Sequence, residues 1–134
     1  MDNNYLNETA LKELIRLLSF SNDPYAHDDL SIVKDAMESF HNYVSTVIKG
    51  ETRLLLQGSD LDGQEYRDAI TQYDGDRHSA HEKAISDVKL LNRLSSRNGL
   101  SLVFTGDDTQ RHQLADFCLE LDQYLFRNRR MRLS

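Results

Sequence analysis

Asp74, Arg77 and His81 are the residues of this chain whose types and spacing best suit chemistry. In a helix, positions three and four residues apart lie on one face. Here that face also carries apolar residues: Ile70, Ala84, Ile85 and Val88. Charged groups on a core-facing surface are rare and need partners when they are buried. The three residues are therefore candidates for a buried polar lock or for a catalytic site.

A structural lock is the interpretation that the sequence favours. Arg77 would form an ion pair with Asp74, and the histidines would donate to carboxylates or backbone carbonyls. His41 is predicted near the centre of the apolar face of the preceding helix, so it could meet Arg77 and His81 inside the protein. Such a network is weak evidence for stability and can instead fix the register of the helices.

A metal site is a second interpretation of the same region. His78 and His81, followed by Glu82, place two imidazoles and a carboxylate on adjacent turns, and Glu38 with His41 forms a Glu-x-x-His pair. Helical bundles build di-metal centres from two such pairs and two further carboxylates. This chain has one pair, and a neighbouring arginine would repel a cation, so no metal or other cofactor is expected.

Arg77 and His81, with polar His78 directly after the arginine, resemble the Arg-polar-…-His signature of the helical HEPN ribonucleases. In that family the pair acts on RNA phosphates at a cleft between two subunits. The resemblance implies an RNA-cleaving enzyme with Arg77 and His81 as catalytic residues, and Asp74 is a further candidate. The family usually places four to six residues between the pair, whereas this chain has three. One residue of slip turns a side chain by about 100° on a helix.

A wider resemblance covers about the middle third of the chain. It rests on these residues: Tyr66-Arg67-Asp68, Asp74, Arg77, Ala80-His81, Ile85 and Leu91-Asn92-Arg93-Leu94. They are similar to a small family of uncharacterised bacterial helical proteins. The resemblance implies a bacterial cytosolic helical bundle, and it implies no activity and no site residues.

Apolar residues recur every three or four positions along almost the whole chain, which predicts an all-α protein. This pattern predicts four helices. The first spans about residues 8–20, the third 62–97 and the last about 109–129. The second begins at residue 28 or 29 and ends at residue 50 or 57. Asn7 is the predicted N-cap of the first helix, and residues 21–27 are the predicted loop after it. Residues 100–104 would be extended or would close one end of the core.

The third predicted helix is long for a protein of 134 residues. Residues 62–97 as one helix would measure about 54 Å, whereas a compact domain of this size has a diameter of about 36 Å. Either the helix breaks, or the bundle is elongated, or a second copy covers the part that projects. Gly75 is the natural break point, because glycine costs about 1 kcal/mol in a helix relative to alanine.

Two predicted helices carry a second apolar stripe away from the first. Leu90 and Leu94 lie on it in the third helix, and Leu119 and Phe126 lie on it in the last helix. Two stripes indicate burial on two sides, and in a small bundle the second side is often an interface between copies. The sequence therefore favours a homodimer, and coverage by residues 100–104 or by the first helix is the alternative.

The charge is distributed unevenly along the chain. Residues 127–134 are basic and contain no acid: their arginines are Arg127, Arg129, Arg130 and Arg132. The rest of the chain has 12 basic and 22 acidic residues, and the net charge of the whole chain is −6. An acidic body repels nucleic acid, so nucleic acid is not an expected partner unless it binds these four arginines. Cations also suit a helix C-terminus, which is the favoured interpretation.

The chain has no apolar run of about 18 residues, so no membrane contact is expected. The polar start is not expected to act as a secretory signal, and the single cysteine, Cys118, fits a reducing cytoplasm. We expect residues 1–134 to form a single all-α domain, an up-and-down bundle of four or five helices with one or two long helices. The favoured function is a non-enzymatic protein-interaction or regulatory module acting as a homodimer, with a different protein as a further partner. The HEPN-like enzyme and the metal-binding bundle are the alternatives.

Overall fold

A computed structural model describes residues 5–57 and 62–128 of the chain. Its helices in this part are α1 (Glu8–Phe20), α2 (Pro24–Gln57), α3 (Gly63–Arg97) and α4 (Arg111–Arg127). The described residues form no β-sheet, and the predicted all-α class is confirmed. None of these helices has the length and apolar character needed to cross a bilayer.

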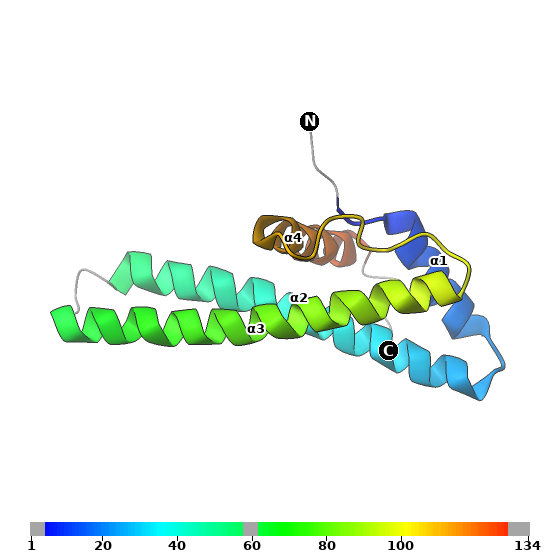
Figure 1. Ribbon diagram of the computed structural model, residues 1–134, viewed down its shortest axis with the longest axis horizontal. Helices are drawn as coiled ribbons and strands as arrows, with labels where there is room; N and C mark the ends of the chain where they lie inside the picture. Colours follow the sequence, from blue (N-terminus) through cyan, green and yellow to red (C-terminus); the bar gives the residue numbers. More distant parts are fainter. Residues whose placement is uncertain (1–4, 58–61, 129–134) are drawn as a thin grey trace.

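The long helices α2 and α3 form an antiparallel hairpin, and the short helices α1 and α4 pack on one part of it (Figure 1). α2 and α3 have 34 and 35 residues and are therefore about 51–53 Å long. α1 and α4 have 13 and 17 residues, about 20 and 26 Å. The short helices cannot cover the whole hairpin, so the molecule is elongated, which is one of the three predicted outcomes.

The predicted starts of α1 and α3 are confirmed by their caps. Asn7 Oδ1 accepts a hydrogen bond from the Ala10 N–H at 3.1 Å. Asp62 Oδ1 accepts one from the Glu65 N–H at 2.8 Å. Each side chain satisfies a backbone donor that the first turn of a helix leaves free. The end of α3 is also as predicted, because Gly99 adopts φ +74° directly after Asn98.

The predicted loop at 21–27 is wrong in its second half, because α2 already begins at Pro24. Proline suits the first position of a helix, where its missing N–H is not needed. Asp23 Oδ1 accepts a hydrogen bond from the Tyr25 N–H at 3.0 Å and satisfies another donor of that turn. The last helix is shorter than predicted and begins at Arg111.

Neither Gly50 nor Gly75, the two glycines inside the hairpin helices, breaks its helix. α2 continues through Gly50, where the ring of Tyr73 from α3 fills the space that a side chain would take. α3 continues through Gly75, so the predicted break at that residue is wrong. Gly75 is exposed and has no neighbouring atoms at the position of a Cβ.

Residues 100–104 close one end of the core, as one of the two predictions had it. Val103 and Phe104 are buried, and Phe104 pairs with Leu6 in an isolated antiparallel bridge. The ring of Phe117 from α4 packs edge-on against Phe104 and against Phe40 of α2, with centroids 4.9 and 5.2 Å apart. These aromatic contacts join α2, α4 and the closing segment in one core.

The core stops part of the way along the hairpin. On α2 the last buried residue is Tyr43, and on α3 the buried residues run from Ala80 onward, with Ala69 as the exception. We call residues 44–57 of α2 and 63–79 of α3 the hairpin arm. Figure 1 shows the arm continuing past the start of α4 without a third helix on it.

Candidate functional site

His81 lies where the core ends and the hairpin arm begins, and it is 8% exposed. Its ring packs against the ring of Tyr43 from α2, with centroids 5.7 Å apart and planes tilted by 49°. Its Nδ1 is buried and has no hydrogen-bond partner. A buried polar atom without a partner is uncommon in a native protein and calls for an explanation.

Asp74 and Arg77 do not form the predicted lock. Asp74 is exposed and Arg77 is half-buried, and no ion pair joins them. They lie on the hairpin arm, where two helices alone cannot enclose a face, so the apolar side of α3 is not a core surface there. The structural lock is therefore wrong, although His81 itself is buried as that hypothesis required.

His41 is also not where the sequence placed it. It is exposed, and its Nδ1 lies 3.1 Å from Oδ2 of Asp122 on α4. The face of α2 that enters the core is centred on Phe40 and Tyr43, which puts His41 at the edge facing α4. His41 therefore ties α4 to the outside of α2 and does not approach His81 from within.

The metal-binding candidates do not converge. Glu38, His78 and Glu82 are exposed, His41 is engaged with α4 and His81 is buried. No group of three or more histidine, cysteine or acidic side chains in the described part of the chain is arranged to hold a metal ion.

Arg111 is a residue of this region that the sequence did not indicate. It is the first residue of α4, and its charge acts on both Tyr43 and His81. Burial lowers the pKa of His81, and the charges of Arg111, Arg77 and His78 lower it further, whereas Glu82 opposes them. Burial raises the pKa of Tyr43, and the same two arginines oppose that shift. Burial and these positive charges therefore both favour the neutral form of His81.

The predicted interface residues have different surroundings. Leu94 is 4% exposed and belongs to the core of its own chain, so it is not available to a partner, and that part of the prediction is wrong. Leu90 and Leu119 are 37% and 44% exposed, and Phe126 is 68% exposed. Without Leu94, the predicted interface consists of these three exposed residues on α3 and α4, and it stays a prediction.

Of the four arginines in the basic C-terminal segment, Arg127 lies among the described residues. Arg127 donates from Nη2 to Oε1 of Glu8 at 3.0 Å and from Nε to the Gln123 carbonyl. It therefore ties the end of α4 to the start of α1. The other three arginines of the proposed nucleic-acid contact, Arg129, Arg130 and Arg132, lie outside the described residues.

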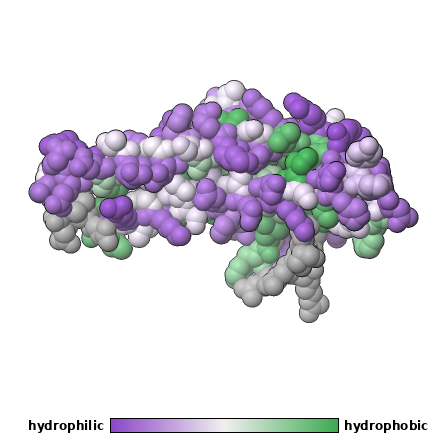
Figure 2. Space-filling view, turned by 90° about the horizontal axis from the view of Figure 1, so that it is seen from below, coloured by the Kyte–Doolittle hydropathy of each residue, from purple (hydrophilic) through white to green (hydrophobic). Residues whose placement is uncertain are grey.

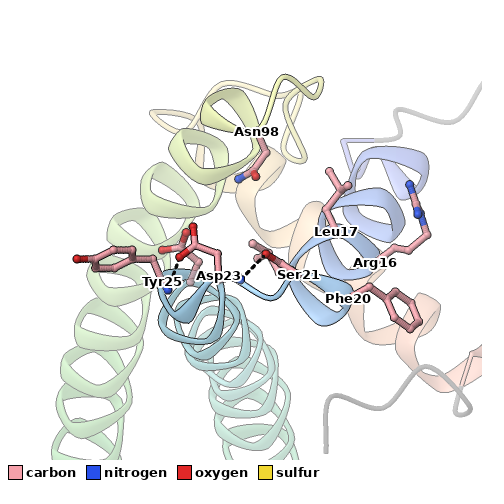
Figure 3. A pocket seen from close by; sticks show the side chains of 10 residues that line it. Arg16, Leu17, Phe20, Ser21, Asp23, Tyr25 and Asn98 are labelled. Carbon is pink, nitrogen blue, oxygen red and sulfur yellow. Dashed lines mark hydrogen bonds between the residues drawn. The ribbon is translucent and has the colours of Figure 1, made fainter.

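A hollow of about 400 Å³ lies at the other end of the molecule, between the end of α1, the start of α2 and Asn98. Figure 3 shows Phe20 and Tyr25 pointing to opposite sides of it. Its charged groups already have partners: Asp29 with Arg97, Arg16 with a glutamate of its own helix, and Asp23 with the Tyr25 N–H. These polar groups stabilise the α1–α2 turn, and the charged side chains of the hollow are engaged within the chain.

A family model described as "Protein of unknown function (DUF3232)" matches residues 5–131. The predicted resemblance to a family of uncharacterised helical proteins is thereby confirmed, and nothing points to the HEPN ribonucleases. No curated protein and no solved structure matches the chain. The bacterial origin and the cytoplasmic location stay predictions.

Proposed function

We propose that this chain, which belongs to the DUF3232 family of proteins of unknown function, is a non-enzymatic interaction module that forms a homodimer through its hairpin arm. The observation that carries the proposal is the missing core of the arm. Among the described side chains of the arm, Ala69 is the one buried apolar residue. An amphipathic helix pair gains its stability from packing against further helices, so the arm is an incomplete bundle.

The exposed apolar side chains of the arm continue a surface that α4 covers elsewhere. His41 faces α4, and Ile48 and Leu55 follow it at intervals of seven residues on α2. Seven residues return a helix to nearly the same side. Ile48 is 54% exposed and Leu55 is 83% exposed, and the hairpin continues past the start of α4 without a third helix on it (Figure 1). A partner helix would take the place that α4 occupies nearer the core.

The charges of the arm favour a second copy as the partner. On α2 the arm carries Lys49 and Arg53 against one acid, Glu51. On α3 it carries two arginines against four acids: Glu65, Asp68, Asp74 and Asp76. In a two-fold arrangement the same surface of each copy meets the other, so α2 of one copy can lie against α3 of its mate. Two hairpins then form a four-helix bundle with opposite net charges facing each other.

Figure 2 shows the side of the arm that is seen from below. Seen from below, the arm is mainly hydrophilic, with a small apolar area beside its tip. That face looks away from α4. We assign the contact to the side of the arm that continues the α4-facing surface of α2, because Ile48 and Leu55 are exposed there.

Light scattering after size exclusion tests the proposal. The unmodified protein is expected to elute as a dimer, and Leu55→Glu is expected to raise the dissociation constant at least about tenfold, because it places a charge in an apolar contact. Phe20→Glu is the matched control, since Phe20 is 80% exposed and lies at the opposite end of the molecule. Circular dichroism checks that each variant keeps its helices.

A strictly monomeric protein at high concentration would contradict the proposal. A dimer that persists with Leu55→Glu but dissociates with Leu119→Glu would instead place the interface on the surface of α3 and α4 that the sequence predicted.

A further inference from the structure

A second hollow lies in the hairpin arm, between α2 and α3. Its volume is about 250 Å³. Lys49 and Arg53 line it from α2, and Tyr73 and Asp76 line it from α3. Pockets for drug-sized ligands measure about 300–1,000 Å³, so this hollow suits a smaller molecule.

One side of the hollow is apolar. The ring of Tyr73 packs on the backbone of Gly50 and fills the space that a side chain would take there, which holds the ring between the two helices. Leu54 and Ala69 line the hollow beside it. We call Leu54, Ala69 and Tyr73 the apolar wall. Contact with this wall would favour a ligand that carries an apolar group.

The charged groups of the hollow have both signs and do not pair. Lys49, Arg53 and Asp76 form no ion pair with one another or with any other residue in 5–57 and 62–128. The side-chain nitrogens of Lys49 and Arg53 therefore lie more than 4.0 Å from the carboxylate oxygens of Asp76. Lys49 and Arg53 are also four residues apart on one helix, where like charges repel each other. A carboxylate bound between them would offset this repulsion.

Asp76 keeps an acceptor available on the other side of the hollow. Its Oδ1 accepts a hydrogen bond from Nε2 of Gln72 at 3.0 Å, and its Oδ2 has no partner among the described residues. A purely anionic ligand would be attracted by the two cations and repelled by Asp76, and a cationic ligand would meet the reverse. A small molecule with both charges close together matches all three groups.

We propose that this hollow binds a free amino acid with an apolar side chain. Its carboxylate accepts hydrogen bonds from Arg53 and Lys49, and the planar guanidinium suits a carboxylate because it can donate two parallel bonds. Its ammonium group donates to Oδ2 of Asp76. Its side chain contacts the apolar wall.

The site does not depend on the proposed dimer. Lys49 and Arg53 lie about 100° and 140° around α2 from Ile48, which belongs to the proposed contact. The hollow is therefore on a different side of the arm, and a second copy bound at Ile48 and Leu55 is not expected to fill it.

The test adds L-leucine to the full chain and follows the amide signals of the arm by NMR. We expect saturable binding in the millimolar range or tighter. Isocaproate lacks the ammonium group of leucine and isoamylamine lacks its carboxylate, so each should bind at least about tenfold more weakly. Arg53→Ala should weaken the binding of L-leucine by a similar factor. Asp76→Asn should also weaken it, but should not weaken isocaproate, which has no ammonium group. A merely structural role of Asp76 would affect both ligands alike.

Two exposed residues of α3 that do not line the hollow provide matched controls. Arg67→Ala and Asp74→Asn should bind L-leucine as the unmodified protein does, and circular dichroism checks that every variant keeps its helices. Absence of saturable L-leucine binding overturns the proposal. Isocaproate binding as tight as that of L-leucine overturns the role of Asp76, and an equal loss of affinity in the control variants overturns the placement of the site.

Discussion

At the scale of single residues, the contact between Gly50 and Tyr73 holds the two helices of the arm together. A Cβ at Gly50 would overlap the ring atoms Cδ1 and Cε1 of Tyr73. Gly50→Ala is therefore expected to destabilise the protein by about 1–3 kcal/mol through overpacking, despite the better helix propensity of alanine. Urea denaturation followed by circular dichroism measures the change.

Two further substitutions serve as controls for Gly50→Ala. Gly75→Ala meets no neighbouring atom, so it should stabilise the protein by about 1 kcal/mol through propensity alone. In a Tyr73→Ala background, Gly50→Ala should also become stabilising. If Gly50→Ala destabilises equally with and without the ring of Tyr73, the packing explanation is wrong.

Cys118 is a second residue whose surroundings decide its chemistry. It is fully buried on α4, and burial raises the pKa of its thiol far above the usual range, with the charge of Asp122 adding to the effect. The thiolate is the reactive form of cysteine. Ellman's reagent at pH 8 is expected to leave the native protein unlabelled and to label one thiol per chain in denaturant. Rapid labelling of the native protein would show that α4 detaches from the core.

At the scale of elements, one side chain fastens the closing segment to α3. Asn92 donates from Nδ2 to the Phe104 carbonyl at 3.0 Å, and its Oδ1 accepts from the Phe104 N–H at 2.9 Å. Asn92→Ala leaves both backbone groups without these partners, which should cost about 1–3 kcal/mol. Thermal unfolding measures the loss. Asn42→Ala, at an exposed position of α2, should change the stability by less than about 0.5 kcal/mol.

The helices could be predicted from the sequence because their signals are local. Asn7 and Asp62 cap the helices that their spacing indicates, and apolar periodicity identifies the buried faces. The tie between Tyr5 and Thr105 could not be predicted, because its hydrogen bond joins residues 100 positions apart. The prediction of the candidate site was wrong for a similar reason. Periodicity places Asp74 and Arg77 on the correct face of α3, but the length and position of α4 decide where that face stops being a core.

At the scale of the whole molecule, the chain is a helical core with a projecting arm, and the two parts should differ in local stability. Amides exchange slowly where helices are packed by buried side chains and faster where they are not. We expect hydrogen exchange measured by mass spectrometry to be slow in residues 84–94, next to the core, and faster in residues 46–56 of the arm. The two segments have equal length and both are helical, so the difference reports packing.

The concentration dependence of this exchange links the arm to the proposed dimer. A partner that binds the native arm adds protection that grows with protein concentration, so exchange in residues 46–56 should slow from low to high concentration. Exchange in residues 84–94 should stay the same. Leu55→Glu should remove the dependence and leave the core segment unchanged. Arm exchange that is independent of concentration in the unmodified protein would mean that the arm stays uncovered, and the incomplete bundle would then need a partner other than a second copy.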